Sequence, residues 1–141
     1  MRFTTRFFIS WLFSALTMFL LFYWWHGVFL NDFQRLNFPL TWFVTFAAFT
    51  YLLFSAGIYM LYESTLMKKI RGFFVRGLVC GVIAGFTLFM ISSIVNISLT
   101  KNLSVQHLII DCAWQITEQS IGAMAIVLCK GFIHEPQTES I

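Results

Sequence analysis

The sequence predicts an all-α integral membrane protein, a bundle of four transmembrane helices whose two ends both lie in the cytoplasm. The first observation is composition: 59% of the 141 residues are hydrophobic and only 11% are charged. The mean hydropathy of +0.80 is far from the balance of a soluble domain. The second observation is four long apolar runs, and the third is an uneven distribution of Lys and Arg between the connections.

The four apolar runs cover about residues 7–28, 40–62, 73–99 and 108–128. Each is long enough for a helix that crosses a bilayer, which needs about 20 residues. The first run follows Arg2 and Arg6 as a secretory signal would, but it is too long and lacks an A-x-A-like cleavage site. We therefore interpret it as a retained span. Pro39 can open the second helix and Ser104 can cap the fourth. The rest forms short connections and a polar cytoplasmic tail at 131–141, so no separate soluble domain is expected.

Basic residues predict the orientation. Arg35 and Lys101 stand alone in the first and third connections, whereas the other seven basic residues belong to the N-terminus, the second connection and the C-terminal side. Because cytoplasmic segments carry an excess of Lys and Arg, these three regions are expected inside the plasma membrane. The seven residues are Arg2, Arg6, Lys68, Lys69, Arg71, Arg76 and Lys130.

Two classes of function are disfavoured. Cys80, Cys112 and Cys129 stand singly inside apolar runs without a C-x-x-C pair, so a thiol redox relay is not expected. The formal net charge of +3 comes from residues beside span ends, which indicates topology and not nucleic-acid binding. The lipid bilayer is the expected partner, and the sequence identifies no cofactor.

The third apolar run predicts a helix–helix contact. Gly77, Gly81 and Gly85 recur every four residues and therefore lie on one helix face, which continues to Ser92 and Asn96. Membrane helices pack through small residues because these allow two backbones to approach closely. The glycine stripe is therefore interpreted as a packing surface, with a glycine-lined ligand path as the alternative.

The fourth apolar run carries the candidate ligand or proton site. His107, Asp111, Trp114 and Glu118 follow steps of four, three and four, which places them within a helix sector of roughly 40°. A carboxylate at a span centre costs about 2.5 to 3.5 kcal/mol on insertion scales. Glu118 lies near the middle of its run, so it must face protein or water. The candidate site comprises Asn96, Asp111, Trp114, Gln115 and Glu118.

Glu118 has no basic partner at its depth, since no Lys or Arg lies in the central part of any run. It is therefore expected to be protonated at neutral pH, to bind a cation, or to pair across an oligomer contact. Asp111 also has a simpler explanation, because the helix dipole favours an acid in the early turns. A further hypothesis is a divalent metal on the outer side, although the spacing matches no known ligand motif. Its candidate ligands are His26, Asp32, His107 and Asp111.

Four short motifs follow one another between about residues 20 and 125. They are Trp25-His26-Gly27-Val28 with Asp32-Phe33, Tyr51-Leu52-Leu53 with Gly57, Gly77 and Gly81 with Asn96, and Asp111-Cys112-Ala113-Trp114. In this order they resemble a small uncharacterised bacterial family of four-span inner-membrane proteins, known only as a domain of unknown function. This chain departs from the family pattern at Gln115, where the family has glycine. It departs again at Phe89 and Met90, where the family has a Tyr-Asp pair, so an intramembrane acid is missing. The resemblance implies fold and location, and no activity.

Two functions fit these features best. One is a small binding or transport protein, whose outer half admits a ligand, an ion or a proton to Asp111 and Glu118. The alternative is an accessory subunit whose polar fourth helix pairs with a larger membrane complex. An intramembrane enzyme needs a nucleophile with a base, or a metal, and is the least favoured. A homo-oligomer is compatible with the first two, and the sequence names no substrate.

Overall fold

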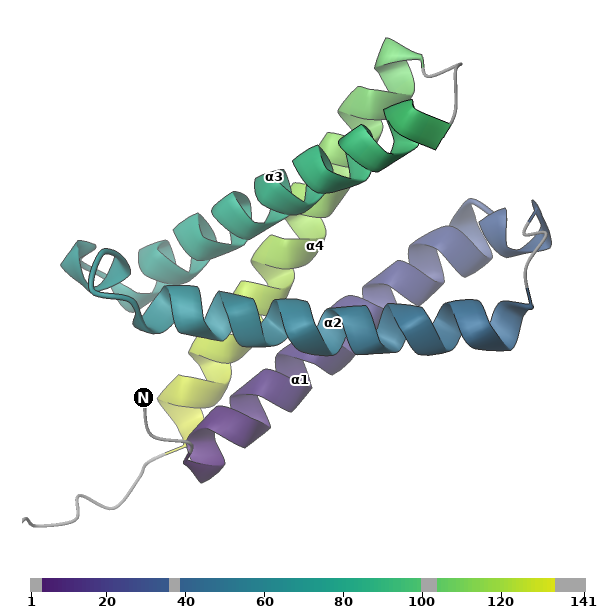
Figure 1. Cartoon of the computed structure of the whole chain (residues 1–141). Helices are drawn as coiled ribbons and strands as arrows, with labels where there is room; N and C mark the ends of the chain where they lie inside the picture. The colour runs from purple at the N-terminus through teal and green to yellow at the C-terminus, as the bar shows by residue number, and fades with distance from the viewer. Residues whose placement is uncertain (1–3, 36–38, 100–103, 134–141) are drawn as a thin grey trace, which may run out of the picture.

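A computed structural model of the chain describes residues 4–35, 39–99 and 104–133, without the side chains of Asp32, Arg35 and residues 96–99. The four long helices are α1 (Thr5–Phe22), α2 (Leu40–Glu63), α3 (Phe73–Leu99) and α4 (Val105–Phe132) (Figure 1). A π-helical stretch, η1 (Tyr23–Phe29), continues α1, and two 3-10 turns, η2 (Asp32–Arg35) and η3 (Met67–Lys69), lie in the connections. No strand occurs in the described ranges, so the predicted all-α class with four helices is confirmed. Most of the predicted tail lies outside these ranges.

Side-chain caps explain where two of the helices begin. Thr4 Oγ1 accepts a hydrogen bond from the Phe7 amide at 3.4 Å, and Ser104 Oγ accepts one from the His107 amide at 3.2 Å. Each cap satisfies an amide that the first helical turn leaves without a partner. The predicted cap at Ser104 is thus confirmed. Before α3 the chain turns at Gly72, whose φ of +94° is rarely adopted by residues with a side chain.

Three helical segments are long and apolar enough to cross a membrane by themselves: Thr5–Phe29, Leu40–Glu63 and Phe73–Val95. Their large apolar side chains are widely exposed on the protein surface, as lipid-facing side chains would be. α4 has 28 residues, about 42 Å of helix at 1.5 Å per residue, which also exceeds the bilayer core. It is the most polar of the four helices, because Asp111, Gln115, Glu118 and Gln119 interrupt its apolar sequence.

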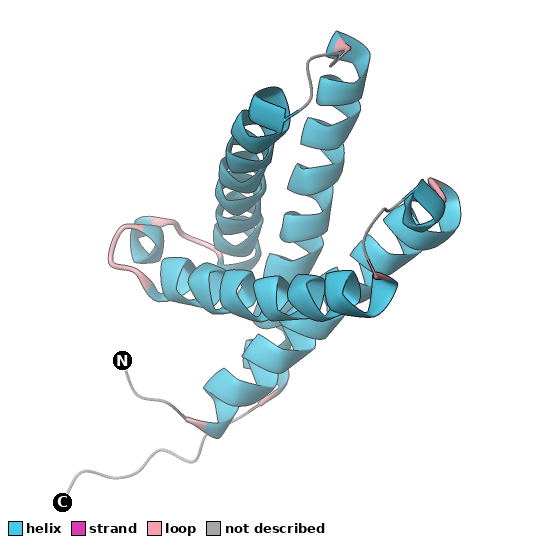
Figure 2. Cartoon of the chain, turned by 45° about the vertical axis from the view of Figure 1, so that its right-hand side comes forward, coloured by secondary structure: helices cyan, strands magenta, loops and turns pink. Residues whose placement is uncertain are grey.

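The helices form two hairpins, α1 with α2 and α3 with α4, joined mainly through a contact between α1 and α4. α4 packs closely against α3 and also against α1, so it is the central helix, whereas α2 contacts α3 and α4 only slightly. The two hairpins cross and then diverge toward the ends of α1 and α3 (Figures 1 and 2). This central position shields much of the polar surface of α4 from the surroundings of the protein.

Small polar side chains hold α1 against both of its neighbours. Ser55 Oγ of α2 donates to the Trp11 carbonyl oxygen at 2.7 Å, and Trp11 Nε1 donates to the Leu52 carbonyl oxygen at 2.7 Å. Toward α4, Ser14 Oγ donates to the Gly122 carbonyl oxygen at 2.8 Å. Interhelical hydrogen bonds of this kind stabilise membrane helix contacts, where no hydrophobic force sorts the helices. An apolar core surrounds them, with Phe7, Met18, Tyr51, Ile58, Tyr59, Ala123 and Ile126.

The glycine stripe of α3 lies against α4. A Cβ atom added at Gly81 or Gly85 would come within 3.0 Å of α4 backbone atoms, and one added at Gly77 would meet the Val127 side chain. The two backbones therefore approach closely at Gly81 and Gly85. The side chain of Asn96, at its predicted end, lies outside the described part of the chain.

Basic side chains gather where α1 and α3 begin and where α2 and α4 end. The Lys130 ammonium pairs with Glu63, and Lys68 Nζ lies 3.2 Å from Glu63 Oε2. Arg6 donates to the Lys130 carbonyl oxygen, and the Arg76 guanidinium lies 3.9 Å from the centre of the Tyr62 ring. Four helix ends and four of the seven predicted inner basic residues are thus at one end of the molecule.

Candidate functional site

Glu118 is the centre of the candidate site, with only 1% of its surface exposed. Positions one turn away on α4 show what its face contacts. Trp114 stacks on Trp25 of η1, with ring centres 4.1 Å apart, and Gly122 lies against Met18 of α1. The Glu118 carboxyl group is therefore directed into the protein, toward α1 and α2, and away from the contact with α3.

The carboxyl group has few hydrogen-bond partners for its degree of burial. Gln119 Nε2 donates to Glu118 Oε1 at 3.3 Å, a long contact. The Tyr51 hydroxyl of α2 and the Trp114 indole N–H lie near the carboxyl group. Even so, Glu118 Oε2 and Trp114 Nε1 have no hydrogen bond of ordinary length and angle within the described residues. No described Lys or Arg side chain forms an ion pair with Glu118.

Other polar atoms around Glu118 are also without partners. Within the described ranges, this holds for Gln115 Oε1 and Gln119 Oε1, three residues before and one residue after Glu118 on α4. A buried polar atom without a partner costs roughly 1 to 3 kcal/mol, so several in one place require an explanation. A polar ligand or water molecules bound among them would supply the missing hydrogen bonds.

A cavity of about 300 Å³ lies next to this group, in the region where the two hairpins diverge. Glu118 is not part of its wall, but the wall includes Tyr51, which lies near the carboxyl group, and Gln115, three residues before Glu118 on α4. All four long helices contribute to the lining. Its residues are Phe22, His26, Phe43, Phe46, Ala47, Thr50, Tyr51, Phe54, Leu88, Ser92 and Gln115.

The π-helical stretch η1 shapes the outer side of the site. A π-helix is wider than an α-helix and changes the direction of the following side chains, which is why such stretches recur at functional sites. Here it stacks Trp25 between Trp114 and Phe29, the latter 4.7 Å away by ring centres. Gly27 leaves room for the Phe33 ring, which would lie 2.5 Å from an added Cβ atom. The Trp-x-Gly motif and the following Phe33 therefore form one packed unit.

The outer predicted residues are more widely spread. His26 is half-buried, 5.1 Å from Phe22 by ring centres, and lines the cavity. Asp111 is half-buried on α4, whereas His107 is exposed and its Nδ1 lies 2.6 Å from Ser104 Oγ. No group of three metal-binding side chains comes together among the described residues. The Asp32 side chain is outside them, so the four-ligand metal site stays a prediction.

Tyr51 and Gln119 belong to the site but were not predicted as members. Tyr51 lies between Ala48 and Ser55 at helical spacing, on the small and polar face of α2, so the pattern contains a signal for it. Gln119 contacts Glu118 from the adjacent position, which no helical period predicts. Its membership depends on the way α4 packs.

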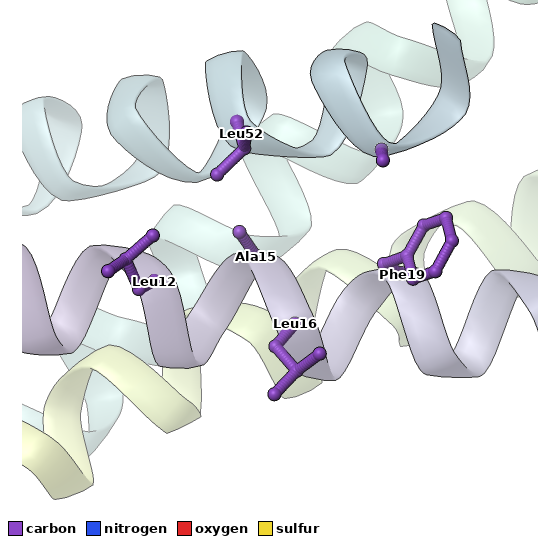
Figure 3. Close-up of a pocket in the computed structure, with 6 residues that line it drawn as sticks. Leu12, Ala15, Leu16, Phe19 and Leu52 are labelled. Atoms are coloured by element: carbon purple, nitrogen blue, oxygen red, sulfur yellow. The ribbon is translucent and has the colours of Figure 1, made fainter. Parts of the chain in front are cut away.

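A second cavity, of about 330 Å³, is a groove between α1 and α2 (Figure 3). Its wall consists of apolar side chains only: Leu12, Ala15, Leu16, Phe19, Ala48 and Leu52. Without a polar group it offers no recognition of a charged or polar ligand, and it suits lipid acyl chains. The cavity beside Glu118 is therefore the stronger candidate.

No protein-family model matches this chain, and no curated protein and no solved structure matches it either. The resemblance to the four-span bacterial family consequently stays a prediction. The functional argument depends on the geometry of this chain alone.

Proposed function

We propose that the chain is a four-span plasma-membrane protein with both ends in the cytoplasm, and that it binds and releases a proton or a cationic ligand at Glu118. The topology is supported by three apolar helices that can cross alone and by a fourth that is long enough. It is also supported by the basic cluster of Arg6, Lys68, Arg76 and Lys130 at one end of the helices. A polar α4 is tolerated because α1 and α3 cover it.

One observation carries the function: the buried Glu118 carboxyl group has an oxygen without a hydrogen bond of ordinary geometry among the described residues, and its neighbour Tyr51 lines a cavity. A structural carboxyl group would be expected to have its hydrogen bonds satisfied. An ionised carboxylate without a counter-ion is costly in this surrounding, so the carboxyl group is protonated at neutral pH when no cation is bound. The cavity, whose wall includes Tyr51, is the proposed route of a proton and a ligand to it.

Proton counting tests this proposal. Wild-type protein in lipid nanodiscs is titrated between about pH 5 and 9, alongside Glu118→Gln, which keeps the side-chain shape without an exchangeable proton. We expect the wild type to release one proton more per chain than Glu118→Gln over this pH range. The matched control is Glu63→Gln, because a carboxylate paired with Lys130 and Lys68 should contribute no proton in this range. Equal proton release by the wild type and Glu118→Gln would refute the proposal.

The alternative function, an accessory subunit, makes a different prediction. In that case a partner helix satisfies the polar atoms of α4, and the chain co-purifies obligately with another membrane protein. A stable preparation of the chain alone, or as a homo-oligomer, with the extra proton of Glu118 would favour the binding role.

A further inference from the structure

The walls of the cavity beside Glu118 are mostly aromatic. Four phenylalanines from α1 and α2 contribute rings, with the imidazole of His26 and the phenol of Tyr51 beside them. Phe22 is the centre of this group, 6.0 Å from Phe43 and 5.4 Å from Tyr51 by ring centres. The phenylalanines are Phe22, Phe43, Phe46 and Phe54. Aromatic faces carry negative charge density, so a cation within about 6 Å of a ring is attracted to it.

The polar groups of the cavity also favour a positively charged ligand. Thr50, Ser92 and Gln115 supply neutral groups, and Tyr51 of the wall lies near the Glu118 carboxyl group. Neither Lys nor Arg lines the cavity within the described residues, so an anion would find no permanently charged partner there. A bare divalent metal would need several oxygen or nitrogen ligands, and these are not gathered in the described part of the chain.

We propose that this cavity binds a monovalent organic cation, an amine or a quaternary ammonium, between its aromatic rings with Glu118 as the counter-ion. The inference rests on the proposed function, because it names the ligand class of the same site. Binding requires a change of protonation: the Glu118 carboxyl group gives its proton to water, and the resulting carboxylate pairs with the cation. Cation and proton therefore compete for Glu118, and the affinity for the cation rises with pH.

The other titratable groups on the elements around Glu118 and the cavity must be separated from it. Tyr51 on α2 and His26 in η1 line the cavity, and Asp111 lies about two turns before Glu118 on α4. Cys80 on α3 packs with Tyr62 and Val127 instead. His26 lines the cavity, so His26→Gln is included as a control. If Glu118 is the competing group, His26→Gln should retain the rise of affinity with pH.

The probe is phenyltrimethylammonium, and the matched neutral probe is tert-butylbenzene, in which carbon replaces the charged nitrogen. Binding to wild-type protein in nanodiscs is measured by calorimetry at pH 6 and pH 8, in buffers of different ionisation enthalpy to count protons. We expect the cation to bind more tightly at pH 8 than at pH 6, and its binding to release up to one proton from the protein. The neutral probe should show neither effect.

Three variants locate the binding. Glu118→Gln should weaken cation binding by about thirty-fold or more, as expected when a buried charge loses its partner. Phe54→Leu removes one aromatic face from the wall and should weaken it by about two- to thirty-fold. Phe49→Leu, on an exposed face of α2 outside the cavity, should leave it unchanged.

The outcomes separate the two proposals. Suppose that the wild-type protein shows the extra proton of Glu118 but binds both probes with the same affinity, or that neither Glu118→Gln nor Phe54→Leu changes the affinity for the cation. In either case the ligand class is wrong and the proton site stands. If Glu118→Gln releases as many protons as the wild type, the proposed function fails as well. If Glu118→Gln does not fold, the Phe54→Leu and Phe49→Leu pair still decides the ligand class.

Discussion

Replacing Gly81 by alanine should weaken the contact between α3 and α4. A Cβ atom at this position would lie 2.9 Å from Ser120 N and 3.0 Å from Gln119 O, whereas ordinary contacts begin at 3.4 Å. Both neighbours are backbone atoms that cannot rotate away. Ser120 Cα lies closer still to the added atom, so the helices must separate by more than 0.5 Å, the difference between 3.4 and 2.9 Å. Overpacking of this kind typically costs about 1 to 3 kcal/mol.

Gly57→Ala is the matched control, because Gly57 is also in a helix interior and nothing lies within 4 Å of an added Cβ atom. Alanine favours a helix over glycine by about 1 kcal/mol, and this gain applies to both variants. The difference in the free energy of unfolding between the two variants therefore isolates the steric term. We expect Gly81→Ala to be the less stable by about 1 to 3 kcal/mol.

The assay is reversible unfolding by SDS in mixed micelles, followed by tryptophan fluorescence. Gly77→Ala should fall between the two variants, since its added Cβ meets a Val127 side chain that can move. Gly81→Leu should be more disruptive than Val82→Leu, whose position is 40% exposed. Equal stability of Gly81→Ala and Gly57→Ala would show that the glycine stripe is not a close backbone contact.

Three further predictions concern topology and packing. A reporter fused after Glu139 should be cytoplasmic and one inserted near Asn31 should be external, because the basic residues collect at the end of the helices opposite to Asn31. Opposite labelling at either position would contradict the proposed orientation. Trp25→Leu should lower stability in detergent by about 1 to 3 kcal/mol more than Trp24→Leu, since Trp25 stacks on α4 and Trp24 is 53% exposed. Equal losses would argue against that stack. Ser14→Ala should cost about 0.5 to 1.5 kcal/mol through its lost bond to α4, and an unchanged thermal midpoint would show that the bond contributes nothing.

The helices could be predicted from the sequence because their signals are local. Long apolar runs, Ser104 as a cap and the four-residue spacing of Gly77, Gly81 and Gly85 all act within one element. The interior position of Glu118 also follows from one helix, since an acid in an apolar run must avoid lipid. These features depend on the cost of burying polar groups, which does not require knowledge of the neighbouring helices.

The partners across helices could not be predicted in the same way. Contact between Tyr51 and Glu118 depends on how far α2 is rotated and where it crosses α4, and many rotations bury the same number of small residues. The π-helical register of η1, which brings Trp25 onto Trp114, involves a shift of backbone hydrogen bonds that leaves no mark in residue spacing. Divergence of the two hairpins, and hence the cavity, arises from the packing of whole helices.

The protonation state of Glu118 tests the central claim most directly. Infrared difference spectra of the wild type against Glu118→Gln, recorded in nanodiscs across about pH 5 to 9 without added cation, resolve the carbonyl band of a protonated carboxyl group from the bands of a carboxylate. We predict that a protonated carbonyl band is present at pH 7, is absent from Glu118→Gln, and is replaced by carboxylate bands when phenyltrimethylammonium is added. A carboxylate band that belongs to Glu118 and is already complete at pH 6, with no cation bound, would contradict the account.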